Sequence, residues 1–303
     1  MDWEANALVA VDLRSGDRLV VSGGTPPRGD GPELQHPRAL SLGGAESHAW
    51  VLCYGRILDV DLTTGARALV SGWDTATMRF SDDPPPQDVR GTGPALKEPK
   101  AITWDRVRSR LVVADRELGA LLAVGLSSGD RTVLSSAKDD APRGKGPKLM
   151  WPIGILMDAP KNRVLVADEA AGFFAVDLGS GDRARVVTEE LSHNSWQWSG
   201  TGPDPNSVGA LAPGHATGSA YLVGGMFGSG GDKVIALDLA KGDRRLVAEL
   251  PEGADRFTDV AAGPGGVLFV SGGHSVWRVE MGAGQTSLLS GARAAVEADD
   301  GER

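Results

Sequence analysis

The sequence predicts an all-β fold, a six-bladed β-propeller built from four-stranded antiparallel blades. Three observations lead to this prediction. A hairpin motif occurs six times in the 303 residues, and its turn glycines are 49, 64, 52, 61 and 42 residues apart. Each unit reads as four short strands, which is the unit of a propeller blade. No amphipathic helical stretch of ten or more residues competes with this pattern.

The recurring hairpin consists of an alternating strand, an Asp-Leu-x-Ser/Thr-Gly-x-Arg turn and a second strand. It is clearest at residues 11–18, 60–67, 124–131, 176–183 and 237–244, and it is degenerate at 279–286. Glycine adopts the left-handed conformation that closes such a loop. The Asp before the loop can accept hydrogen bonds from turn N–H groups, and the Arg after the glycine can pair across the strands. We therefore expect these Asp and Arg residues to be structural.

Two further motifs flank the hairpin. A strand ending in Val-Ala-Asp precedes it at residues 111–115 and 164–168. A glycine-rich segment follows it at 28–32, 90–94, 143–147 and 199–203, which we call the glycine loops. Each glycine loop leads into a short strand, and none is followed by the Lys-Ser/Thr and helix of a phosphate-binding loop. The glycine loops are therefore interpreted as turns.

The first unit is incomplete when the strands are lettered A to D from the axis outward. Residues 2–8 align without gaps to residues 115–121, so the chain starts where the end of a strand B is expected. The first blade is thus predicted to lack its two inner strands. Two explanations are open: a truncated N-terminus, which we favour, or a ring that closes imperfectly. The predicted domain covers residues 1–290, and residues 291–303 are a C-terminal tail.

Composition excludes several classes of protein. The net charge of −9 argues against a general nucleic-acid partner, which requires a basic face. No apolar run is long enough to span a membrane, and no signal peptide opens the chain. If a signal has been removed, a periplasmic or secreted location is expected; otherwise the compartment is unknown. The single cysteine, Cys53, lies in an apolar run and is expected to be buried.

The chain resembles the six-bladed propellers of the NHL-repeat and gluconolactonase-like superfamily. The resemblance rests on the Pro-x-Ala/Gly-Ile strands, the Val-Ala-Asp strand ends and the Asp-Leu-x-Ser/Thr-Gly-x-Arg hairpins, and it spans nearly the whole chain. It implies a fold rather than a function, because propellers carry unrelated activities. In gluconolactonase-like enzymes, Glu, Asn and Asp ligands of a divalent metal sit at the x position of strand A.

In this chain no carboxylate occupies the x position. It is expected to hold Arg38, Lys100, Ile153, Val208 and Thr258, and Asp259 lies one place further on. Such residues do not supply the hard oxygen ligands that calcium prefers. No cofactor is therefore expected, with a divalent cation at the channel mouth as the alternative. A residue matching the catalytic glutamate of strictosidine-synthase-like enzymes is also missing.

The candidate binding surface is the face formed by the D–A and B–C connections, which we call the upper face. Long loops on a rigid scaffold often carry binding. Paired cations near the axis could hold an anion, and an exposed Trp could stack on a sugar or ring. The candidate ligand-binding residues are Arg38, Lys100, Asp259, His36, Trp151, Trp196, Trp198 and His193. The alternative is that the cations pair with neighbouring carboxylates and the Trp residues pack against blades.

The function predicted from the sequence is a non-catalytic propeller scaffold that binds a protein or a small, anionic ligand on the upper face. The alternative is a divergent lactonase or hydrolase of the gluconolactonase-like superfamily. A carbohydrate-binding propeller ranks lower, because only the glycine loops repeat. The five histidines show no metal-ligand spacing, and no Gly-x-Ser-x-Gly or His-Glu-x-x-His motif occurs.

Overall fold

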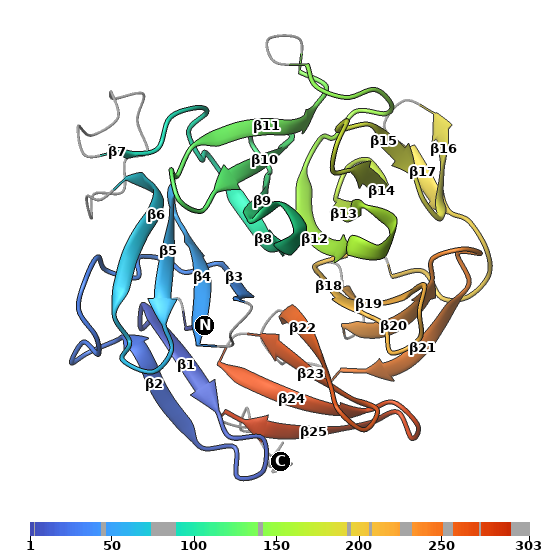
Figure 1. The fold of residues 1–303 in the computed structure, drawn as a ribbon. Helices are drawn as coiled ribbons and strands as arrows, with labels where there is room; N and C mark the ends of the chain where they lie inside the picture. The colour runs from blue at the N-terminus through green and yellow to red at the C-terminus, as the bar shows by residue number, and fades with distance from the viewer. Residues whose placement is uncertain are drawn as a thin grey trace, which may run out of the picture.

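The sheets form a ring around a central axis (Figure 1). The computed structural model describes residues 1–2, 4–43, 47–73, 89–138, 142–192, 195–205, 208–224, 232–250, 257–272 and 274–291. Within these ranges the only helices are the single 3-10 turns η1 (Arg106–Arg108) and η2 (Ala159–Lys161), each between a strand A and a strand B. The predicted all-β propeller is therefore confirmed.

Each complete blade consists of four consecutive antiparallel strands, the first innermost. The first comprises β3 (Ala39–Leu42), β4 (His48–Cys53), β5 (Arg56–Asp61) and β6 (Arg67–Trp73), with β7 (Val89–Arg90) added at its edge. The second and third comprise β8 (Pro99–Asp105), β9 (Arg110–Asp115), β10 (Ala120–Gly125), β11 (Arg131–Ser136), and β12 (Pro152–Asp158), β13 (Arg163–Asp168), β14 (Gly172–Asp177), β15 (Arg183–Arg185). The last two comprise β18 (Ala210–Pro213), β19 (Ser219–Gly224), β20 (Lys233–Asp238), β21 (Arg244–Glu249), and β22 (Phe257–Gly263), β23 (Val267–Gly272), β24 (Ser275–Glu280), β25 (Gln285–Ser290).

Two smaller sheets accompany these five blades in the described part of the chain. Strands β1 (Ala7–Val11) and β2 (Arg18–Gly23) form a two-stranded sheet between the first and last complete blades (Figure 1). Strands β16 (Thr188–Ser192) and β17 (Ser195–Trp198) form a hairpin in the connection after β15. The described residues thus contain five complete blades, where six repeats were recognised in the sequence.

The hairpin turns between strands C and D are capped as predicted. Asp12, Asp61, Asp177 and Asp238 each accept two backbone N–H groups of their own turn at 2.7–3.0 Å. Because these bonds favour the charged carboxylate, the pKa of each of these aspartates is lowered from its usual value. The recurring Asp is therefore structural.

The recurring Arg joins blades instead of pairing across its own hairpin, so that expectation was wrong. Arg183 is the clearest example, and it is 6% exposed. Its Nε donates to Pro147 O at 2.6 Å, and its Nη1 donates to Ser135 Oγ at 2.7 Å and to Arg143 O at 2.8 Å. Arg67, Arg131 and Arg244 make corresponding bonds to the glycine loops before their own blades. A fork of five donors suits a ring of carbonyl groups.

The glycine loops provide the surface that the recurring Arg and its hairpin contact. Gly144 and Gly146 have φ of +75° and +104°, and a Cβ at either position would lie 1.9 Å from Gly181 O or Arg183 O. Any side chain would therefore push the loop off the neighbouring hairpin. These loops are turns, as predicted, and their glycines serve the contact between strand D and the loop before its blade.

The apolar core lies between the blades. Strands β9, β13 and β19 each have five buried residues in a row, and the side chains alternate between the two faces. Separate apolar clusters join each pair of consecutive complete blades. Cys53 is buried as predicted, and burial raises the pKa of its thiol to about 12. The described residues include no helix with the length and apolarity that a membrane crossing requires.

Candidate functional site

The innermost strands begin with a shared irregularity on the upper face. In β8 the register shifts between Pro99 and Ala101, so Lys100 is the extra residue, and Ile153 is its counterpart in β12. Arg38 and Gly209 hold the corresponding place in two other blades. Each directly precedes its strand A, and its backbone N–H donates to strand B, to Leu52 O and Val223 O respectively. Gly209 therefore occupies the x position of its strand, and Val208, predicted there, lies in the core at 8% exposure. A bulge re-aims side chains at a ring mouth.

The two predicted cations near the axis have aromatic or acidic neighbours. Lys100 Nζ lies 2.7 Å from Glu98 Oε1, and Arg38 lies 5.8 Å from the centre of the Tyr54 ring. Burial of Glu98 is outweighed by its bonds to Lys100 and Arg116, so the pKa of this carboxyl is lowered. The Lys100 ammonium is therefore neutralised by Glu98, two residues before it in the chain. Arg38 remains exposed at the ring mouth.

Asp259 lies in β22, the innermost strand of its blade. Its carboxylate accepts the Val260 N–H at 2.8 Å, and the α-amino group of Met1 acts on it electrostatically. The residue is open to solvent, yet protein surrounds it on most sides, and this partial desolvation raises the pKa of its carboxyl. The same surroundings lower the pKa of the Met1 amine. Asp259 is thus the acidic residue of the ring mouth, with an amine beside it.

The ring mouth does not fit a divalent metal of the gluconolactonase type. Arg38, Lys100, Ile153, Gly209 and Thr258 occupy the x positions of the five complete blades, and none is a carboxylate residue. Within the described ranges, no group of three His, Cys, Asp or Glu side chains could hold a metal. Calcium takes six to eight oxygen ligands, which this set does not supply.

The four histidines that the structure describes do not converge on one site. His36 donates its backbone N–H to Asn6 Oδ1 at 2.9 Å, and His274 lies 3.6 Å from Glu4. On the opposite face, His48 lies 3.0 Å from Asp59 Oδ1, and His215 contacts Tyr221 OH at 3.1 Å. His193 lies outside the described residues.

The strand β17 contains two of the Trp residues predicted to bind ligand, Trp196 and Trp198. Trp198 is 8% exposed, its ring centre is 6.1 Å from that of Phe173, and the Arg244 guanidinium covers it at 5.4 Å. Its indole is therefore part of the core and is not offered to a surface ligand, because the β16–β17 hairpin folds this face inward. Trp196 lies in the same strand, and its side chain is outside what the structure describes.

Trp151 is the predicted aromatic residue that the structure places on the upper face. It is 45% exposed and directly precedes β12. Its backbone N–H and that of Met150 donate to Asp168 Oδ2 at 3.0 and 2.8 Å, while Asp168 Oδ1 accepts the N–H groups of Ala170 and Ala171. The strand-end Asp thus ties the D–A connection to the B–C turn. This frame holds Trp151 on rigid backbone.

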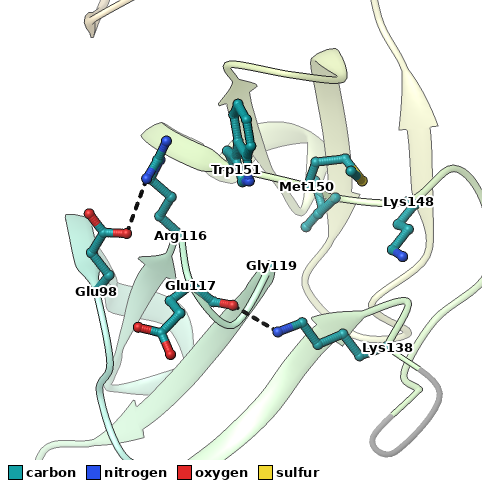
Figure 2. A pocket seen from close by; sticks show the side chains of 9 residues that line it. Glu98, Arg116, Glu117, Gly119, Lys138, Lys148, Met150 and Trp151 are labelled. Carbon is teal, nitrogen blue, oxygen red and sulfur yellow. Dashed lines mark hydrogen bonds and ion pairs between the residues drawn. The ribbon is translucent and has the colours of Figure 1, made fainter. Parts of the chain in front are cut away.

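A pocket of about 310 Å³ lies beside Trp151, between the blades β8–β11 and β12–β15. Its lining residues come from the D–A and B–C connections: Glu98, Arg116, Glu117, Gly119, Lys138, Lys148, Leu149, Met150 and Trp151. Figure 2 shows Trp151 and Met150 along one wall, Arg116 and Glu98 at one end, and Lys138 and Lys148 at the other. The Arg116 guanidinium lies 4.8 Å from the Trp151 ring centre.

In this pocket the two carboxylates have cationic partners, whereas two ammonium groups have no carboxylate partner among the described residues. Glu98 lies 3.3 Å from Arg116, and Glu117 lies 3.1 Å from Lys97. Lys138 Nζ donates to the Glu117 carbonyl oxygen at 2.7 Å rather than to a carboxylate. Among the described residues, neither Lys138 nor Lys148 has a carboxylate within ion-pair distance. Both carboxylates of the lining are thus neutralised, and two ammonium groups remain at one end.

Sequence reasoning found Trp151 but missed its partners. Arg116 directly follows the strand-end Asp115, just as Glu169 follows Asp168, and their N–H groups donate to Glu98 O and Trp151 O at 3.0 Å. The repeat therefore carried a usable signal: the residue after Val-Ala-Asp meets the residue before strand A. Lys138 and Lys148 flank the glycine loop that was interpreted as a turn alone, and their convergence depends on the packing of two blades.

Comparisons with known proteins place the fold but not the family. No family model matches the chain, and no curated protein sequence matches it. Among solved structures, a chain of a nidogen–laminin complex is similar with a TM-score of 0.63 and 13% identity, covering 93% of this chain and 89% of that one. A gluconolactonase from Xanthomonas campestris is similar with a TM-score of 0.59 and 16% identity, covering 91% and 80%. Hydrazine synthase from Kuenenia stuttgartiensis gives 0.53 and 12%, covering 83% and 65%. At these identities the similarity shows a propeller fold alone.

Proposed function

We propose that this protein is a non-catalytic propeller scaffold that binds a small anionic ring compound, such as a sugar acid, in the Trp151 pocket. The observation that carries the proposal is the combination of an exposed Trp with two ammonium groups that lack a carboxylate partner among the described residues. The pocket volume of about 310 Å³ is at the small end of ligand sites.

The chemistry of the lining favours this ligand class. The free face of an indole stacks on a sugar or an aromatic ring, and the Arg116 guanidinium at its side fixes the orientation of Trp151. Lys138 and Lys148 present point charges that suit a carboxylate or phosphate. An anion entering here neutralises a local positive charge on a protein of net charge −9, so the site selects the sign of its ligand.

The enzyme alternative depends on Asp259. A carboxyl whose pKa is raised by its surroundings is a candidate general acid or base, and a gluconolactonase is among the similar structures. Lactone hydrolysis that falls in Asp259→Asn would favour this alternative. We place it second because the ring mouth lacks the ligand set of that enzyme type.

A protein ligand on the same face is also compatible with the fold, since one similar structure is a chain of a nidogen–laminin complex. The small-molecule proposal is preferred because the exposed apolar surface at the pocket is a single Trp with basic residues around it. A protein interface of standard size needs roughly 800 Å² from each partner.

We also propose that β1 and β2 are strands C and D of a sixth blade, within a gluconolactonase-like ring. Arg18 Nε donates to Ser290 Oγ at 2.8 Å, as Arg183 Nη1 donates to Ser135 Oγ in the blade junction described above. A Cβ on Gly16 would lie 2.0 Å from Leu289 O, as one on Gly181 would lie 2.1 Å from Leu134 O. The β1–β2 hairpin thus repeats the outer contact of a complete blade.

Isothermal titration tests the binding proposal with glucuronate, galacturonate and glucose 6-phosphate, three ring compounds that each carry an anionic group. We expect at least one of the three to bind, with affinity lowered about tenfold or more by Lys148→Glu and by Trp151→Ala. Lys161→Glu is the matched control, because Lys161 lies in η2 at the other end of β12 and keeps the same change of charge. Binding that is equal in Lys148→Glu and the wild type, or absent for all three probes, would refute the proposal.

A further inference from the structure

The Trp151 pocket has two chemically different ends. Figure 2 shows the carboxylates of Glu98 and Glu117 together on one side of it. The ammonium groups of Lys138 and Lys148 lie on the other side. All four residues line the same cavity of about 310 Å³. One end therefore offers hydrogen-bond acceptors and the other offers positive charge, so a ligand that fills the pocket meets both.

The charges at the carboxylate end cancel. Three carboxylates and three cations are joined there by ion pairs of 2.7–3.5 Å, and they are Glu98, Glu117 and Glu169 with Lys97, Lys100 and Arg116. A second anionic group placed at this end would meet carboxylates whose cations are already engaged. The pocket thus attracts an anion only at the lysine end, and it suits a ligand with a single anionic group.

Glu117 retains an oxygen atom for a ligand. Its Oε1 lies 3.1 Å from Lys97 Nζ, and its Oε2 has no hydrogen-bond or ion-pair partner in the described part of the chain. By contrast, Glu98 uses Oε1 for Lys100 and Oε2 for Arg116. The Glu117 side chain is 57% exposed, so a ligand can reach it. Because a carboxylate accepts hydrogen bonds and donates none, this oxygen calls for an O–H or N–H group on the ligand.

The backbone of Glu117 fixes the acceptor relative to the positive charge. Lys138 Nζ donates to the Glu117 carbonyl oxygen at 2.7 Å, so one residue holds an ammonium group and supplies the acceptor. The turn around it is tied to the core, because the Leu118 N–H donates to Oδ1 of the fully buried Asp115 at 3.0 Å. The pocket therefore presents both groups on a rigid turn, and this arrangement requires a ligand with matching groups at its two ends.

We propose that the pocket selects pyranoses that carry one anionic group, and that Glu117 determines this specificity. The inference rests on the proposed function and narrows its ligand class. The anionic group lies at Lys138 and Lys148, the ring lies on Trp151, and a hydroxyl at the far end of the ring donates to Glu117 Oε2. An acid without hydroxyls covers this carboxylate and removes its water without replacing the hydrogen bond. A diacid places a second negative charge against it.

Isothermal titration of the full chain with three ring acids tests the inference. The probes are glucuronate, cyclohexanecarboxylate and trans-cyclohexane-1,4-dicarboxylate, which share a six-membered ring and a carboxylate. We expect glucuronate to bind about tenfold more tightly than either of the others, since a hydrogen bond to a charged group has that worth. In Glu117→Ala the affinity ratio of glucuronate to cyclohexanecarboxylate should fall to about one. The freed Lys97 charge acts on both monoanions alike, so it cancels in this ratio.

Two further variants complete the comparison. Glu117→Gln keeps an oxygen acceptor without the charge, so it should preserve most of the ratio and let the dicarboxylate bind more tightly than in the wild type. Glu280→Ala is the matched control, because Glu280 is also an exposed glutamate in an ion pair, 3.4 Å from Arg278, and lies in β24 of another blade. It should leave the ratio unchanged.

The outcomes separate this inference from the proposed function. Equal affinity of the wild type for glucuronate and cyclohexanecarboxylate would overturn the selection of hydroxylated rings, while the anion site at the lysines would stand. A ratio that is the same in Glu117→Ala and in Glu280→Ala would overturn the role of Glu117. If none of the three acids binds, the proposed function fails, and this inference fails with it.

Discussion

Removal of the buried Arg183 side chain tests the contact that joins neighbouring blades. In Arg183→Ala, three short hydrogen bonds to Pro147 O, Ser135 Oγ and Arg143 O disappear, although Arg143 O still accepts the Ser136 N–H. A hydrogen bond contributes roughly 0.5–1.5 kcal/mol net, or roughly 1.5–3 kcal/mol when one group is charged, and the part-buried acceptors place each of these three at about 1–1.5 kcal/mol. We therefore expect the free energy of unfolding to fall by about 3–4 kcal/mol.

The first repeat contains the matched control. Arg18 occupies the same motif position and is exposed, and among the described residues its side chain donates to Ser290 Oγ alone, at 2.8 Å. Arg18→Ala should cost only about 1 kcal/mol. Guanidinium chloride unfolding followed by circular dichroism, at equal m-values, measures both variants. Equal losses for Arg183→Ala and Arg18→Ala would show that the glycine-loop carbonyls do not stabilise the ring, and the reasoning would fail.

Three further predictions follow from the same contacts. Asp168→Ala removes the acceptor of four backbone N–H groups, so it should lower stability by about 2–3 kcal/mol and weaken glucuronate binding, whereas Asp17→Ala, on an exposed turn, should leave binding unchanged. Cys53, whose pKa is raised to about 12 by burial, should resist iodoacetamide at pH 8 in the native state and react at the rate of unfolding; fast native labelling would contradict its burial. Because the folded-state pKa values of Asp12, Asp61, Asp177 and Asp238 are lowered, their contribution is present above the ordinary Asp pKa and is lost as pH falls through the folded values. Asp177→Asn should flatten the fall in Tm measured below pH 4, and an unchanged acid profile would argue against the caps.

The repeat made the fold predictable, and local chemistry made the turns predictable. The caps by Asp61 and Asp177 follow from the residue types alone, because a short carboxylate next to a tight turn meets its N–H groups. The role of Arg183 was not predictable in this way. Its partners lie about 40 residues away in sequence and reach it only when two blades pack.

The candidate site was predictable only in part. Trp151 was found because it precedes a strand A, and its exposure agrees with that place. Trp198 looked equivalent in sequence, but the β16–β17 hairpin folds its ring against Phe173. No sequence motif marks Lys148 as a binding residue. Its role depends on the charges of Glu98 and Glu117 being neutralised by other cations. Side-chain pairing across a blade junction is a tertiary property, and one repeat motif does not encode it.

The most direct test of the binding account is the indole spectrum of Trp151. In protein labelled with ¹⁵N at its eight Trp residues, Trp151→Phe assigns the signal. Glucuronate should shift the Trp151 indole N–H in a saturable way, leave the buried Trp198 signal in place, and lose its effect in Lys148→Glu but not in Lys161→Glu. A Trp151 signal that does not move at high concentrations of glucuronate, galacturonate and glucose 6-phosphate would contradict the account.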